Sequence, residues 1–176
     1  MSLLWIFAYL VAERSFELFL SRRNCQTLAV RGGREFYTET YPRIIALHIL
    51  FLLALFVESF PWRVHLGLYT IVLLALFVLL QVGRYWCIIS LGEYWNTRIV
   101  TVPGDRIKRT GPYRWLTHPN YLVVTLEFLI LPLLMHAPYS LAVFFPVNLL
   151  LLRQRIRLEE KALRECTDYN EQSLKL

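Results

Sequence analysis

Polar side chains that can bind ligands and move protons interrupt the apolar C-terminal half of the chain. His118 and Tyr121 are three residues apart and share a helix face, and Glu127 lies about two turns further along. Glu127 and Asn148 both stand in apolar runs, where a polar group without a partner costs several kcal/mol. Such groups need each other or a shared cavity. The sequence therefore predicts a polar pocket within apolar surroundings.

A second polar set lies on the last apolar segment and its continuation. Arg153 and Arg157 are four residues apart, and Arg157 and Glu160 are three apart with Glu159 between them. A break at residues 136–138 indicates a tight helical hairpin, which would bring both polar sets to one pocket. The alternative is that these arginines reach toward lipid headgroups as anchors, with the two glutamates as their surface ion partners.

Long apolar blocks set the fold class. Hydrophobic residues make up 56% of the 176-residue chain and charged residues 18%, a composition typical of membrane proteins. Lipid offers no partner to an open backbone, so each block is expected to form a helix. We predict an all-α polytopic membrane bundle of five transmembrane helices, with a C-terminal helical hairpin and a cytoplasmic tail helix. The five blocks are residues 2–20, 44–60, 66–89, 121–135 and 139–152.

Basic residues are concentrated in two of the links between these blocks. Links 22–43 and 92–119 each contain five Lys or Arg residues, whereas the turn near Pro61 contains one and the turn near Pro138 none. Because basic links stay on the cytoplasmic side, we expect the N-terminus outside and the C-terminus in the cytoplasm. The expected location of so short an apolar chain is a bacterial inner membrane. The cytoplasmic basic links account for the net charge of +6, so no nucleic-acid partner is expected.

Several short motifs follow one another in the C-terminal half. They are Gly111-Pro112-Tyr113-Arg114, His118-Pro119-Asn120-Tyr121-Leu122, Glu127, Asn148, Arg157-Leu158-Glu159-Glu160 and Leu163. As an ordered series between hydrophobic helices, residues 92–165 resemble the isoprenylcysteine carboxyl methyltransferase family. Two positions depart from the family pattern, because Thr117 stands where an arginine is usual and Val123 where a glycine is frequent.

The resemblance implies a methyltransferase that uses S-adenosylmethionine as its cofactor. It implies catalytic roles for three residues: Arg157 would orient the substrate oxygen, Glu160 would position Arg157 or accept a proton, and Glu159 would support both. The expected substrate is a lipophilic small molecule or lipid-linked acceptor that is methylated on a carboxylate or hydroxyl oxygen. The cofactor-binding residues implied in the same way are His118, Tyr121, Leu122, Glu127, Asn148 and Arg153, with Glu127 near the cofactor's ammonium group.

Two other function classes stay open. A membrane oxidoreductase of the sterol-reductase type, which uses NADPH, shares a similar helical core. In a non-enzymatic membrane subunit the same polar residues would be structural. The three cysteines, Cys25, Cys87 and Cys166, lack the spacing of metal ligands, so no metal site is expected. The oligomeric state is left open.

The organisation of the chain is expected to be simple. Residues 1–176 are predicted to form one domain, in which residues 1–91 carry the first three spans and residues 92–176 form the cofactor-binding catalytic half. Aromatic residues in segments 94–96 and 113–115 are expected to lie in an interfacial belt rather than to contact substrate.

Overall fold

Five α-helices make up most of the structure, a computed structural model that describes residues 2–167. Each predicted apolar block corresponds to one of them, so the expected all-α class is confirmed. Two strands of three residues each are the extended elements in the described range. The helices are α1 (Leu4–Val30), α2 (Tyr41–Glu58), α3 (Leu68–Leu91), α4 (Pro119–Leu134) and α5 (Pro138–Cys166).

Helices α1 and α5 extend beyond the apolar blocks from which they were predicted. Ser21, Asn24 and Leu28 continue the buried face of α1, so the link expected from residue 22 begins only after Val30. Helix α5 continues without interruption to Cys166. The predicted tail helix is therefore the second half of α5, as far as residue 167.

Two segments between residues 2 and 167 are long and apolar enough to cross a membrane. They are Thr38–Glu58, which contains α2, and Leu68–Tyr94, which contains α3. Helix α4 is apolar but shorter, whereas α1 contains charged residues and α5 is charged in its second half. Length and composition thus identify two of the five expected spans.

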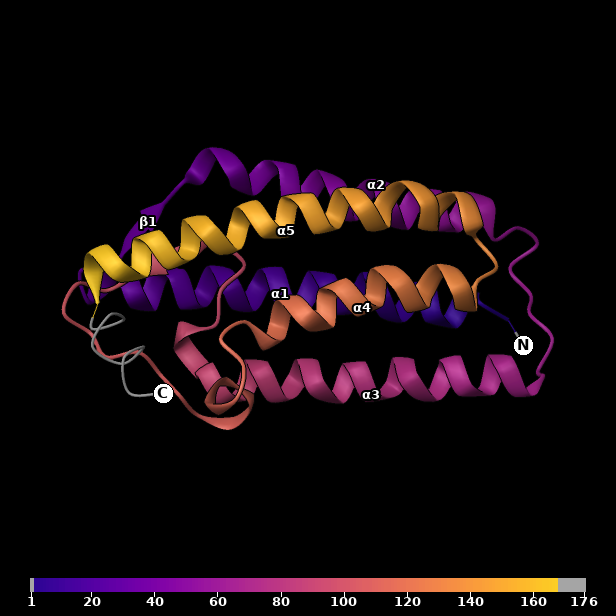
Figure 1. Cartoon of the computed structure of the whole chain (residues 1–176), viewed down its shortest axis with the longest axis horizontal. Coiled ribbons are helices and arrows are strands. Elements are labelled where there is room, and N and C mark those ends of the chain that lie inside the picture. The colour runs from indigo at the N-terminus through magenta and orange to yellow at the C-terminus, as the bar shows by residue number, and fades with distance from the viewer. Residues whose placement is uncertain (1, 168–176) are drawn as a thin grey trace.

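The helices run up and down along the long axis of the molecule (Figure 1). The links before α2 and before α4, together with the C-terminal end of α5, lie at one end, and the other two turns lie at the opposite end. At the first end, β1 (Arg34–Phe36) pairs antiparallel with β2 (Ile99–Thr101). This pairing attaches segment 92–118 to the link between α1 and α2.

An apolar core and a buried ionic cluster hold the bundle together. In the core, the rings of Phe51 on α2 and Phe128 on α4 stack with centroids 4.0 Å apart. In the cluster, Arg84 of α3 donates to Glu17 of α1 at 2.6 Å and to Glu127 of α4. Three helices far apart in sequence are therefore joined by charged groups inside the bundle.

Candidate active site

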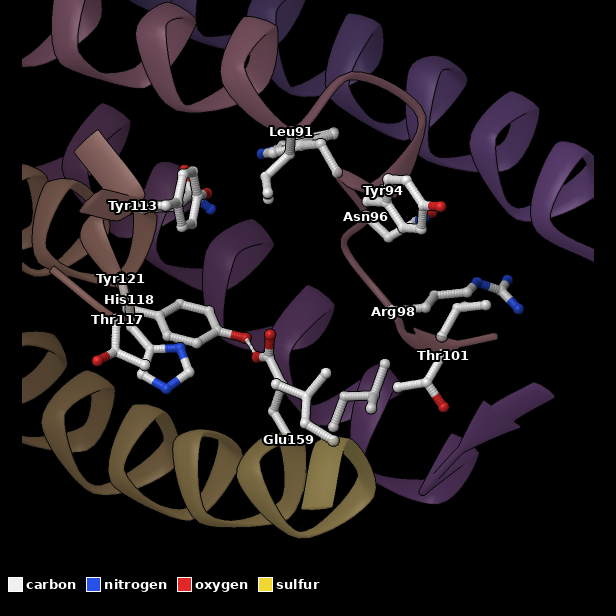
Figure 2. A pocket seen from close by; sticks show the side chains of 15 residues that line it. Leu91, Tyr94, Asn96, Arg98, Thr101, Tyr113, Thr117, His118, Tyr121 and Glu159 are labelled. Carbon is white, nitrogen blue, oxygen red and sulfur yellow. Dashed lines mark hydrogen bonds between the residues drawn. The ribbon is translucent and has the colours of Figure 1, made fainter. Parts of the chain in front are cut away.

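Two adjoining cavities lie at the end of the bundle where segment 92–118 packs against α4 and α5. Figure 2 shows the first cavity, in which side chains from this segment face side chains from the start of α4 and from the later part of α5. Its polar lining residues are Tyr94, Trp95, Asn96, Arg98, Thr101, Tyr113, Thr117, His118, Asn120, Tyr121 and Glu159. Tyr113, Thr117, His118 and Glu159 also line the second cavity. The two cavities thus share a common wall.

The helical hairpin brings together four of the residues predicted for the site. The rings of His118 and Tyr121 stack with centroids 5.4 Å apart. His118 Nε2 lies 3.3 Å from Glu160 Oε1, and the Tyr121 hydroxyl donates to Glu159 Oε2. Both glutamates come from α5, so the α4–α5 turn creates this group as the sequence predicted.

Arg155 joins the same group, although the sequence analysis did not assign it a role. Its side chain is buried, its Nε donates to the Tyr121 hydroxyl at 3.2 Å, and a second nitrogen donates to the Thr97 carbonyl at 2.6 Å. A signal was present in the sequence, because residues 148, 152, 155, 159 and 162 recur at helical spacing along one face of α5. Arg153 and Arg157 lie off that face and are exposed.

Buried polar atoms without partners are concentrated around the first cavity. Seven buried side-chain nitrogen or oxygen atoms within residues 2–167 have no hydrogen-bond partner, and four of them belong to residues that line this cavity. Leaving such an atom unpaired costs about 1–3 kcal/mol, so each of them needs a partner from water or from a bound polar ligand. The four atoms are Trp95 Nε1, Asn96 Nδ2, Thr101 Oγ1 and Asn120 Oδ1.

The second cavity is basic and partly apolar. The side chains of Trp115 and Leu116 contribute apolar surface, and those of Arg106, Arg109 and Arg114 contribute positive charge. Burial raises the pKa of the Tyr113 phenol in the shared wall, so this group remains a neutral hydrogen-bond donor at physiological pH.

Six residues predicted for the site line neither of these two cavities. Glu127 is buried in the ionic cluster, where Arg14 donates to it at 2.5 Å and Gln81 at 2.8 Å. Its charge is therefore already balanced within the bundle. Asn148 is buried within the bundle, and its Nδ2 has no partner among the described residues. Leu122, Arg153 and Arg157 lie on exposed helix surfaces, and Glu160 lies beside His118 outside both linings.

The aromatic segments also differ from expectation. Trp95 is only 2% exposed and lines the first cavity, so its assignment to an interfacial belt is wrong. Tyr94 and Tyr113 line both cavities. Trp115 is exposed, as an interfacial residue should be. These positions were missed because aromatic side chains beside basic residues are typical of both a membrane interface and a ligand site.

Comparison with known protein families identifies this arrangement. The model of the isoprenylcysteine carboxyl methyltransferase family matches residues 72–165, which is more than half of the chain. The chain belongs to the isoprenylcysteine carboxyl methyltransferase family. The match runs from α3 to the end of α5 and thus contains both walls of the first cavity, whereas α1 and most of α2 precede it. Membership of this family indicates a methyltransferase-like function and a membrane-associated protein.

Two bacterial relatives extend this similarity over nearly the whole chain. The uncharacterized protein YpbQ of Bacillus subtilis is 41% identical over 160 residues, covering 91% of this chain and 95% of that protein. An uncharacterized protein of Haemophilus influenzae is 27% identical over 158 residues, covering 89% and 92% respectively. No solved structure matches the chain significantly.

Proposed function

We propose that this protein transfers a methyl group from S-adenosylmethionine to a carboxylate or hydroxyl oxygen of a lipophilic acceptor. The observation that carries this proposal is the cavity lined by unpartnered polar atoms within the family-matched region. When bound, the cofactor supplies an electrophilic methyl group on a sulfonium cation. Its adenine and amino-acid ends need both hydrogen-bond donors and acceptors.

The lining residues fit those needs. Trp95 Nε1 and Asn96 Nδ2 are donors, and Asn120 Oδ1 is an acceptor, that have no hydrogen-bond partner among residues 2–167. Glu159 contributes negative charge beside them and suits a cationic group. We propose that His118 and Tyr121 complete the binding surface. Leu122, Glu127, Asn148 and Arg153, which the family resemblance also implied, would support it from outside the two cavities.

The polar group on α5 is the proposed catalytic centre. Arg155 holds the Tyr121 hydroxyl, and this hydroxyl in turn donates to Glu159, so the carboxylate is oriented toward the cavity. If the acceptor is a hydroxyl, its proton must leave, and Glu160 beside His118 is the proposed base. We assign substrate orientation to an arginine of this helix, for which Arg155 and Arg157 are the candidates.

The second cavity is the proposed acceptor site. Its apolar residues suit a hydrocarbon tail, and its arginines suit an acidic oxygen. Because it shares Tyr113, His118 and Glu159 with the first cavity, an acceptor there would lie beside the cofactor. Alignment of two reactants in a site shielded from water accounts for much of the rate of such transfers.

We also propose that the chain is one domain that crosses a bacterial inner membrane five times, with its N-terminus outside and its C-terminus in the cytoplasm. Segment 92–118, with five Lys or Arg residues, lies at the same end of the bundle as the end of α5, which supports this orientation (Figure 1). Fusion of a reporter that is active only in the cytoplasm to the C-terminus, and to the turn near Pro138, tests it. Reporter activity at the turn and not at the C-terminus would show that the topology is the reverse of the proposed one.

Titration of the detergent-solubilised protein with S-adenosylhomocysteine tests the cofactor assignment. We expect saturable binding by calorimetry, weakened by His118→Ala. A membrane reductase would instead bind NADPH, and a scaffold subunit would bind neither compound. Absence of S-adenosylhomocysteine binding to folded protein would therefore refute the proposed function. Labelled S-adenosylmethionine incubated with a lipid extract then identifies the acceptor.

A further inference from the structure

One face of α1 holds the wall of the first cavity, although α1 precedes the region matched by the family. Asn24 Nδ2 donates to the carbonyl of Trp95 at 2.7 Å and to that of Gly92 at 3.1 Å. Ser21 and Cys25, on the same face of α1, contact the side chain of Asn96. The backbone and side chains at residues 92–97 are therefore positioned by a helix from the other end of the sequence.

The contacts around Ser21 set the orientation of the Asn96 amide. A serine hydroxyl has two lone pairs and one proton. Ser21 Oγ accepts a hydrogen bond from the Thr97 backbone N–H at 3.0 Å. It also lies 2.8 Å from Thr97 Oγ1, and the Tyr41 hydroxyl lies 3.1 Å from that same oxygen. When Tyr41 donates its proton to Thr97 Oγ1, Thr97 donates its own proton to Ser21 Oγ. The proton of Ser21 is then left for Asn96 Oδ1, at 3.3 Å. Cys25 Sγ donates to the same oxygen at 3.0 Å.

This arrangement leaves the nitrogen of the Asn96 amide as the unpaired end. Within the described part of the chain, Asn96 Nδ2 and Trp95 Nε1 are buried without a hydrogen-bond partner, and both residues line the first cavity. Arg98 also lines the cavity, but its guanidinium points away from it (Figure 2) and pairs with Glu35 at 3.0 Å. Two N–H donors on consecutive residues are suited to bind a carboxylate.

We infer that Ser21 and Cys25 are positioning residues that fix the Asn96 amide so that its N–H₂ group donates to the carboxylate of the bound cofactor's amino-acid end. This inference rests on the proposed function, because it requires a cofactor with an amino-acid end. The first helix, outside the family-matched region, thereby sets the affinity for the cofactor.

A double-mutant cycle with S-adenosylhomocysteine as the probe tests the inference. The variants are Asn96→Ala, the α1 pair Ser21→Ala with Cys25→Ala, and the triple variant, all purified as the full chain in detergent. Loss of a hydrogen bond to a charged group should weaken binding about tenfold in Asn96→Ala and about fivefold in the α1 pair. In the Asn96→Ala background the α1 pair should add less than about twofold, because its partner is gone.

Two controls separate positioning from general loss of structure. Ser15→Ala removes an α1 hydroxyl that bonds only to Val11 of its own helix, and it should leave affinity unchanged. Ser21→Thr keeps the hydroxyl and should restore binding relative to Ser21→Ala. The second probe is 5′-methylthioadenosine, which lacks the carboxylate, and its affinity should be equal in wild type and Asn96→Ala.

The outcomes distinguish the inference from the function on which it rests. Two results would overturn the positioning role in a wild type that binds S-adenosylhomocysteine. One is that the α1 pair of substitutions leaves the affinity unchanged, and the other is that its effect on affinity adds fully to that of Asn96→Ala. If Asn96→Ala weakens the affinity for both probes equally, the assignment of Asn96 to the carboxylate is overturned. Failure of the folded wild type to bind S-adenosylhomocysteine overturns the proposed function and the inference together.

Discussion

Arg84 on α3 donates hydrogen bonds from two of its nitrogens to the carboxylate of Glu127 on α4. Both side chains are 1% exposed, and Glu17 of α1 is bound to Arg84 as well. Charged groups in such surroundings are tolerated only when they are paired and hydrogen-bonded. Removing one member is therefore far more disruptive than removing a surface ion pair.

The substitution Arg84→Leu should destabilise the bundle by about 3–5 kcal/mol, because it leaves buried carboxylates without their main cation. Thermal unfolding in detergent, followed by circular dichroism, measures the loss. Arg31→Leu is the control, since Arg31 pairs with Glu93 at the surface and its loss should leave the midpoint nearly unchanged. Equal effects of the two substitutions would contradict the role given to the cluster.

Substitutions of Arg155 and Arg157 should have separable effects on methyl transfer. Arg155→Ala removes the group that joins Tyr121 to the Thr97 carbonyl, and we expect at least about a hundredfold loss of kcat, typical for a lost orienting contact. Arg157 is exposed and has no hydrogen bond or ion pair within residues 2–167. Rates measured for Arg157→Ala on an identified acceptor show which arginine orients the substrate. If only Arg157→Ala lowers the rate of methyl transfer, the orienting role belongs to Arg157.

Gly111→Ala should disturb the site through backbone packing. Gly111 has a φ of +54°, and a Cβ there would lie 2.0 Å from Ser90 Oγ and 2.9 Å from Trp86 Nε1 on α3. We expect at least about a fivefold weaker affinity for S-adenosylhomocysteine, because the clash displaces Tyr113. Gly104→Ala is a matched control, since Gly104 has a φ of +82° with no atom within 4 Å of the added Cβ. If both substitutions weakened the affinity to a similar extent, the cause would be strain from the positive φ rather than the close approach of Ser90 and Trp86.

Glu58 should contribute to stability without contributing to the site. Its carboxylate accepts from the backbone N–H groups of Tyr139 at 2.8 Å and Ser140 at 2.7 Å, so α2 caps the start of α5. Glu58→Ala should cost about 1–2 kcal/mol in thermal unfolding experiments, as loss of a helix cap does. Binding of S-adenosylhomocysteine should be unchanged, because the cap lies at the opposite end of α5 (Figure 1). A large loss of binding would show that the two ends are coupled. Glu39→Ala, at an exposed position, serves as the neutral control.

Much of the architecture follows from the order of residues alone. Apolar blocks of sufficient length are expected to become helices where lipid excludes water, and the break at residues 136–138 makes the last two antiparallel neighbours. The hairpin brings His118 and Tyr121 to Glu159 and Glu160 because the start of α4 and the later part of α5 both lie at the end of the hairpin away from its turn. Helical periodicity and the position of the turn were therefore sufficient to predict that these two sets of residues meet, but not which pairs they form.

The partners of the remaining polar residues depended on packing between helices that are distant in sequence. Glu127 was expected at the cofactor and is held by Arg84 and Arg14, while Arg155 rather than Arg157 is buried and bonded to Tyr121. Helical periodicity predicts which face of a helix is polar, but it cannot determine which other helix lies against that face. For a buried charge the neighbouring helix determines the pairing, because desolvation is offset only by a partner that is close in space.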